Sequence, residues 1–146
     1  MNRQSNFTWL CIAVCGLVFL PLSPCTGASA DLINLASPNR APGSFFITFK
    51  SPAELASIPR AELDSLTMLP GVVPTNNDAV TRLAKAIAAE VGGTVQGIAF
   101  SSDQPAFDLE GANDDARVRR LASDPRIARI VANIMLAPTK DGSDKH

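Results

Sequence analysis

The order in which apolar patterns change along the chain restricts the fold more than any other feature of this sequence. The stretch "SFFITFK" (44–50) combines aromatic and β-branched residues, which favour a β-strand. Residues 77–91 instead place apolar side chains at three- and four-residue steps, and this period predicts a helix with one buried face. Asn77 can cap the start of this helix, and Gly92-Gly93 can end it because glycine accepts the left-handed conformation of a helix exit.

The following residues repeat this alternation of strand and helix. "TVQGIAF" (94–100) predicts a strand with a bulge at its glycine, and "PAFDLEG" (105–111) predicts a strand that returns beside it. Asn113 can cap a second helix, which ends at Pro125, and "IARIVANI" (127–134) predicts a last strand. We therefore expect an α+β fold of the ferredoxin-like βαββαβ type, with an antiparallel four-stranded sheet and two helices on one face.

Three segments lie outside this pattern. Residues 31–43 contain two prolines and a glycine and are expected to form a linker. Residues 51–76 contain further prolines, and within them we predict only a short helix around Arg60 to Leu66. The domain is therefore expected to span residues 44–138, followed by a polar C-terminal tail, residues 139–146.

The first 30 residues have the features of a secretory signal peptide. Arg3 precedes a nearly unbroken apolar run from Trp9 to Leu22, and Ala28-Ser29-Ala30 has the small-residue form of a cleavage site. A membrane anchor is disfavoured because the run is shorter than the roughly 20 residues that a bilayer needs. We expect a secreted or periplasmic protein that begins at Asp31, with lipidation at Cys25 as the alternative outcome.

The composition argues against enzymatic and nucleic-acid-binding functions. The chain carries 13 Lys and Arg against 14 Asp and Glu, without the basic excess that nucleic-acid binding requires. All three cysteines precede the expected cleavage site and the one histidine is the last residue, so we expect no catalytic residues, no cofactor and no metal. Asp114-Asp115 is interpreted as favourable charge at a helix start. The phenylalanines of the first strand are interpreted as core residues: Phe45, Phe46 and Phe49.

Four stretches resemble, in order and spacing, the inhibitor I9 family, which comprises the propeptides of subtilisin-like serine proteases and their free-standing inhibitor relatives. These stretches are "FFITFK", "AAEVGGTVQGIAF", "AFDLEG" and "RLASDPRIARIV". The last one carries the family pattern of a leucine, an Asp-Pro pair and two spaced aliphatic residues. The resemblance covers about residues 44–138 and is interrupted by the longer segment 51–76.

The resemblance implies a serine protease inhibitor, or an intermolecular folding helper, that acts on a subtilisin-like protease. Its sheet would pack against the enzyme, and its C-terminal segment would lie product-like in the active-site cleft. Leu136 would occupy an outer hydrophobic pocket, and Thr139 would lie nearest the catalytic serine. The protease-binding residues that the resemblance implies are Asn133, Leu136, Ala137, Pro138 and Thr139.

The sequence departs from the family at one functional position. Propeptides of this family usually place acidic residues just after the final valine of the last strand, where they can cap helices of the enzyme. Here Val131 is followed by Ala132 and Asn133, and only Asn133 offers a side-chain oxygen. No protease domain follows in this chain, so we expect a separate target protease and a monomeric free protein. The alternative is an exported, non-inhibitory binding module of the same fold.

Overall fold

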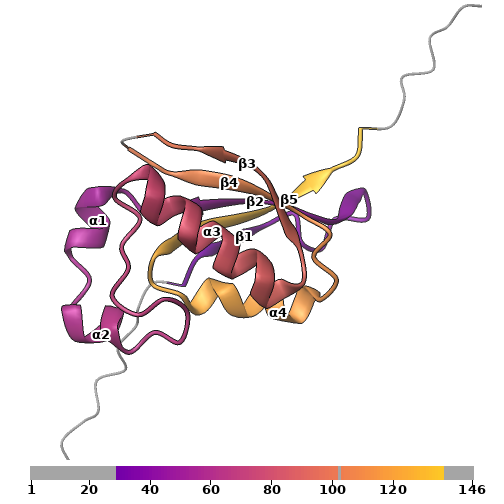
Figure 1. Ribbon diagram of the computed structural model, residues 1–146. Coiled ribbons are helices and arrows are strands. Elements are labelled where there is room, and N and C mark those ends of the chain that lie inside the picture. The colour runs from indigo at the N-terminus through magenta and orange to yellow at the C-terminus, as the bar shows by residue number, and fades with distance from the viewer. Residues whose placement is uncertain (1–28, 102, 137–146) are drawn as a thin grey trace, which may run out of the picture.

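The computed structural model describes residues 29–101 and 103–136, and it has an α+β fold (Figure 1). One five-stranded sheet has the strand order β1-β5-β2-β4-β3. Helices α3 and α4 lie together on one face of this sheet, and α1 and α2 lie at one end of it. The elements are β1 (Asp31–Ile33), β2 (Arg40–Phe49), α1 (Pro52–Ala56), α2 (Arg60–Asp64), α3 (Asn77–Val91), β3 (Thr94–Ala99), β4 (Ala106–Glu110), α4 (Asp115–Arg120), a 3-10 turn η1 (Leu121–Ser123) and β5 (Ile127–Ile134).

The α+β class predicted from the sequence is confirmed, but the expected four-stranded antiparallel sheet is wrong. Strands β5, β2, β4 and β3 are antiparallel neighbours, whereas β1 adds a fifth strand that runs parallel to β5. The sheet is therefore mixed. Two further expectations are confirmed: α3 ends at Gly92, whose φ is 72°, and the β3–β4 register shifts between Val95 and Gly97.

The segment 31–43, expected to be a linker, instead contains β1 and the beginning of β2. The prolines and the glycine of this segment are compatible with both strands because of where they lie. Pro38 lies in the connection between them, and Pro42 and Gly43 lie in the irregular stretch of β2 where the register shifts between Arg40 and Phe45. A proline in such a stretch does not remove a hydrogen bond from a regular ladder.

The capping residues of the two longer helices differ by one position from the prediction. The side chain of Asn76, rather than Asn77, accepts a hydrogen bond from the Ala79 amide at the start of α3. Asp114, rather than Asn113, accepts hydrogen bonds from the amides of Ala116 and Arg117 at the start of α4. Adjacent Asn and Asp residues are equally good caps, so sequence alone does not choose between them.

The proline-containing segment 51–76 holds two helices, of which only α2 was predicted. Helix α1 begins with a capping box, in which Ser51 and Glu54 each bond the other's backbone amide. Pro52 occupies the first turn of α1, where a missing amide hydrogen costs nothing. Pro52 therefore marks the beginning of a helix and does not interrupt one.

Arg126 fixes the rest of this segment to the domain. Its side chain is fully buried, and its guanidinium donates hydrogen bonds to three backbone carbonyls of the segment. Nη1 bonds the carbonyls of Leu69 and Val72, each at 3.0 Å, and Nη2 bonds that of Met68 at 2.7 Å. The segment that precedes α3 is thereby held against the turn that leads into β5.

The hydrophobic core lies between the sheet and the helices α3 and α4. Alternate residues of β2 and β5 point into it, and the apolar face of α3 covers them. Among the described residues, no helix is long and apolar enough to cross a membrane. The fully buried large apolar side chains are Phe45, Ile47, Phe49, Val80, Leu83, Ile87, Val91, Phe107, Leu109, Val118, Ile127 and Ile130.

Candidate functional site

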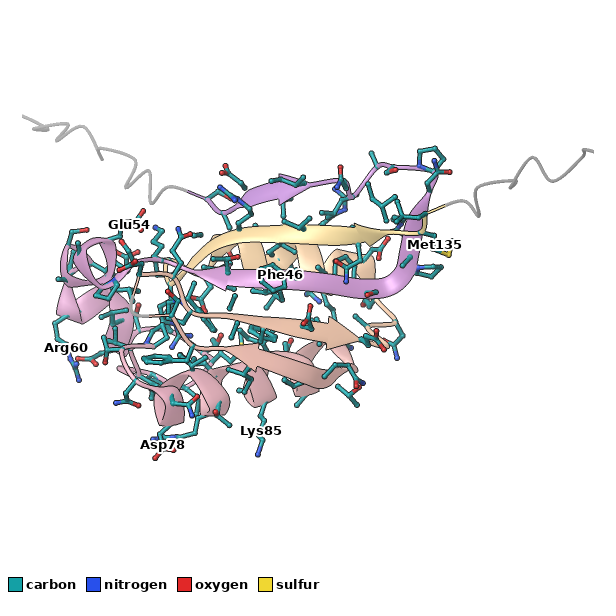
Figure 2. The ribbon with its side chains drawn as sticks, turned by 90° about the horizontal axis from the view of Figure 1, so that it is seen from above. Phe46, Glu54, Arg60, Asp78, Lys85 and Met135 are labelled. Carbon is teal, nitrogen blue, oxygen red and sulfur yellow. The ribbon has the colours of Figure 1, made fainter. Side chains whose placement is uncertain are left out.

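Strand β5 ends in an exposed apolar segment. The exposed fraction rises from 46% at Ile134 to 57% at Met135 and 91% at Leu136, the last described residue. The backbone is nevertheless tied to the fold up to this point. Ile134 is in register with Arg40 of β2, and the Met135 amide donates a hydrogen bond of 2.8 Å to the carbonyl of Asn39. The domain therefore presents Leu136 directly after a fixed strand end, and Figure 2 labels Met135, the residue before it.

The structure places two of the five residues implied to bind a protease. Leu136 lies at the exposed end of β5, and Asn133 lies within β5, three residues before it. Ala137, Pro138 and Thr139 lie outside the described residues. The Asn133 side-chain amide donates a hydrogen bond of 2.8 Å to the hydroxyl of Ser44 on β2. This bond fixes the orientation of the Asn133 side chain on the strand.

We define the open face of the sheet as the face opposite α3 and α4, which carries Phe46 (Figure 2). Asn133 belongs to this face because it lies two residues after Val131, the β5 residue that pairs with Phe46. The central row of this face crosses all five strands in register. Ile33 of β1 lies beside Val131 of β5, and Val131 lies beside Phe46 of β2. Phe46 pairs in turn with Asp108, which pairs with Gly97.

The three apolar residues of this row are accessible. Ile33 is 37% exposed, and Val131 and Phe46 are half-buried. Phe46 was expected in the core together with Phe45 and Phe49, and that expectation is wrong for Phe46. Neighbouring residues of a strand point to opposite faces, so Phe45 and Phe46 cannot both be buried under the helices. This alternation was the sequence signal that could have placed Phe46 on the open face.

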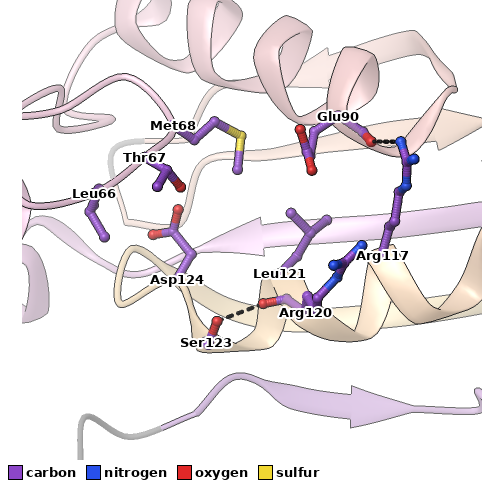
Figure 3. A pocket seen from close by; sticks show the side chains of 9 residues that line it. All are labelled: Leu66, Thr67, Met68, Glu90, Arg117, Arg120, Leu121, Ser123 and Asp124. Carbon is purple, nitrogen blue, oxygen red and sulfur yellow. Dashed lines mark hydrogen bonds between the residues drawn. The ribbon is translucent and has the colours of Figure 1, made fainter.

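A separate hollow of about 480 Å³ lies on the helix side of the molecule (Figure 3). Met68 and Leu121 give it an apolar part, and side chains of both charges surround it. Arg117 donates a hydrogen bond of 3.0 Å to the Glu90 carbonyl, and the Ser123 hydroxyl donates one of 2.7 Å to the Arg120 carbonyl. The serine hydroxyl is thus used in a backbone contact. Its lining residues are Leu66, Thr67, Met68, Glu90, Arg117, Arg120, Leu121, Ser123 and Asp124.

A second hollow is lined in part by an ion pair between β2 and α4. Arg40 donates a hydrogen bond to Asp115, and the two side chains are 27% and 40% exposed. This hydrogen bond lowers the pKa of Asp115 and raises the pKa of Arg40. The contact ties the start of β2, next to the end of β5, to the helix layer beneath it.

Within the described part of the chain, no cluster of three or more histidine, cysteine or acidic side chains could hold a metal ion. Comparison with protein-family models gives no match, and neither does comparison with curated proteins. The exposed end of β5 and the open face of the sheet both present apolar side chains that a partner could contact. The open face also carries the polar side chains of Asn133 and Asp108, and a mixture of apolar and polar groups suits binding to a protein surface.

Proposed function

We propose that this protein is a secreted inhibitor, or an intermolecular folding helper, of a subtilisin-like serine protease. The observation that carries the proposal is the end of β5, where an extended, anchored strand leads to a Leu136 side chain that is 91% exposed. Export through the N-terminal signal peptide is part of the same proposal. So is a ferredoxin-like relationship for the β2-α3-β3-β4-α4-β5 portion of the fold.

Binding would use the segment that continues β5. An extended segment can add itself to a sheet edge in the protease cleft, where main-chain hydrogen bonds give affinity and alternate side chains fill pockets. Leu136 would fill an outer hydrophobic pocket, and Thr139 would lie nearest the catalytic serine. Ala137 and Pro138 would span the distance between these two positions. The segment would then occupy the cleft as a cleavage product does.

The folded domain would strengthen this binding by presenting the segment in advance. The hydrogen bond from Met135 to Asn39 and the β5–β2 pairing restrict the backbone just before Leu136. A flexible peptide of the same sequence would lose more conformational entropy when it binds. A second contribution would come from Asn133, whose side-chain oxygen can accept a hydrogen bond from a helix start of the protease. That contact would be weaker than one made by a carboxylate.

The test is an inhibition assay of the purified exported protein against a bacterial subtilisin. We expect competitive inhibition that is lost when residues 136–146 are removed, while circular dichroism and the unfolding transition stay close to those of the intact protein. Absence of inhibition by the intact, folded protein across several subtilisin-like enzymes would contradict the proposal.

The second candidate is an exported binding module that does not inhibit proteases. The open face favours it, because Ile33, Val131 and Phe46 form an accessible apolar row that does not depend on the C-terminal segment. A ligand bound only through this face would not respond to removal of residues 136–146. The truncated protein therefore discriminates between the two candidates.

A further inference from the structure

We infer that β1 widens the protease-binding surface and that Ile33 is an additional contact residue that contributes to specificity. This inference rests on the proposed function, since it assigns a further part of the molecule to the same partner. Strand β1 lies before residue 44, where the resemblance to the inhibitor family begins, so the resemblance does not account for this strand.

The register of β1 directs Ile33 and its neighbour Leu32 to opposite faces. Ile33 pairs with Val131, whose side chain is on the open face, and Leu32 pairs with Ile130, which is fully buried in the core. Residues paired across adjacent strands point to the same side of a sheet. Ile33 therefore extends the row formed by Val131 and Phe46, whereas Leu32 does not.

Strand β1 is held by contacts that remain after cleavage at Ala30. All three of its residues pair with β5, from Asp31 beside Arg129 to Ile33 beside Val131. After the strand, Leu35 is buried against the core. Ile33 is thus held in place on a short edge strand, and a partner that contacts it pays little conformational entropy.

The partner that fits this row is the protease whose cleft takes the end of β5. Val131 and Leu136 are five residues apart on one extended chain, or about 17 Å at the rise of a β-strand. A stable protein–protein complex buries about 800 Å² on each partner, more than a segment of four residues supplies. The enzyme must therefore contact more of this domain than the tail, and α3 and α4 already cover the other face of the sheet.

The experiment compares two substitutions of adjacent residues with similar exposure. Leu32 is 41% exposed and Ile33 is 37% exposed, so Leu32→Asp and Ile33→Asp place the same charge on opposite faces of one strand. Each variant of the exported protein is assayed for its inhibition constant against subtilisin, beside Leu136→Asp as a tail variant. Circular dichroism and urea unfolding establish that each variant is folded.

We expect Ile33→Asp to weaken inhibition at least about tenfold and Leu32→Asp less than about twofold. A tenfold loss corresponds to about 1.4 kcal/mol, a typical value for one well-buried interface residue. If Ile33→Asp does not fold, the pair Ile33→Ala and Leu32→Ala is used, with an expected loss of at least about threefold for Ile33→Ala alone.

The outcomes separate this inference from the function on which it rests. Equal effects of the Ile33 and Leu32 variants, together with a strong effect of Leu136→Asp, would overturn the role of β1 and leave the inhibitor function intact. No inhibition by the unsubstituted protein would overturn both.

Discussion

Arg126 and Asp124 form a buried, two-pronged ion pair across Pro125, at the entrance to β5. Nε of Arg126 lies 3.0 Å from Oδ1 of Asp124, and Nη2 lies 2.7 Å from Oδ2. The two side chains are 0% and 9% exposed. The same guanidinium also holds the segment 68–72 through three carbonyls. A single side chain therefore joins the Asp-Pro turn, the last strand and the proline-containing segment.

Replacing Arg126 with Met is expected to destabilise the protein by about 3 to 5 kcal/mol, because the buried Asp124 carboxylate loses its partner. The carbonyls of Met68, Leu69 and Val72 lose their donors at the same time. The free energy of unfolding is measured by urea denaturation. Arg82→Met, on the exposed side of α3, is the control and should change stability by less than about 0.5 kcal/mol. Equal stabilities of the two variants would contradict the role given to Arg126.

Truncation of Ile87 or Ile130 to Ala should each cost about 2 to 5 kcal/mol. Ile87 of α3 is 1% exposed and Ile130 of β5 is 0% exposed, and both belong to the same core cluster. Removing either side chain leaves a cavity between the helix layer and the sheet. Thermal or denaturant unfolding gives the values, and a loss below about 0.5 kcal/mol is expected only of a surface position.

The position of the mature N-terminus should affect stability. Cleavage after Ala30, the site predicted from the sequence, removes the hydrogen bonds that the Ser29 hydroxyl and the Ala30 amide donate to the Ala122 carbonyl. We expect a protein of residues 29–146 to be more stable than one of residues 31–146 by about 0.5 to 1.5 kcal/mol per bond lost. Urea unfolding of both forms tests this, and N-terminal sequencing of the exported protein identifies the natural start. A lipidated Cys25 would disprove cleavage at Ala30.

The Arg40–Asp115 ion pair should make stability depend on acidic pH. Arg40 lowers the pKa of Asp115 in the folded protein, so the pair stabilises the fold above the ordinary aspartate pKa of about 3.9. That stabilisation is lost as the pH falls below about 4. The Asp115→Asn variant lacks this stabilisation at every pH. The difference in unfolding free energy between the unsubstituted protein and this variant should therefore shrink as the pH is lowered from about 5 to about 2. Because both side chains are partly exposed, the difference at neutral pH should be only about 0.2 to 1 kcal/mol. A difference that stays constant with pH would count against this pair.

The C-terminal segment carries the functional prediction. Leu136→Asp should weaken inhibition of subtilisin by about tenfold or more, because a carboxylate in an apolar pocket loses its water without gaining a partner. Ser143→Asp introduces the same charge further along the tail, outside the described residues, and should have little effect. Inhibition constants are measured for both, with circular dichroism to establish folding. Equal inhibition by the two variants would contradict placement of Leu136 in a protease pocket.

Local patterns in the sequence were sufficient to predict most of the secondary structure. The apolar period of α3, its end at Gly92 and the bulge at Gly97 are consequences of residues close to one another in the chain. The exposed strand end at Leu136 could be predicted for the same reason, since an apolar run continues past the last core residue. Alternation along β2 also contained the information that Phe45 and Phe46 face opposite ways.

The remaining features depend on contacts between distant residues. Strand β1 is only three residues long, and its anchor joins Ser29 to Ala122, 93 residues away, so nothing near residues 31–33 signals a strand. In the sequence, Arg126 has no feature that distinguishes it from an exposed arginine after a proline. Its burial is possible because Asp124 lies beside it and because folding brings three distant carbonyls to its guanidinium. Periodicity along the chain determined the elements themselves. Only the tertiary structure determined that β1 joins the sheet, that the segment 51–76 is held against the domain, and which side chains lie together on the open face. Each of these features requires contacts between residues that are distant in the chain and meet only on folding.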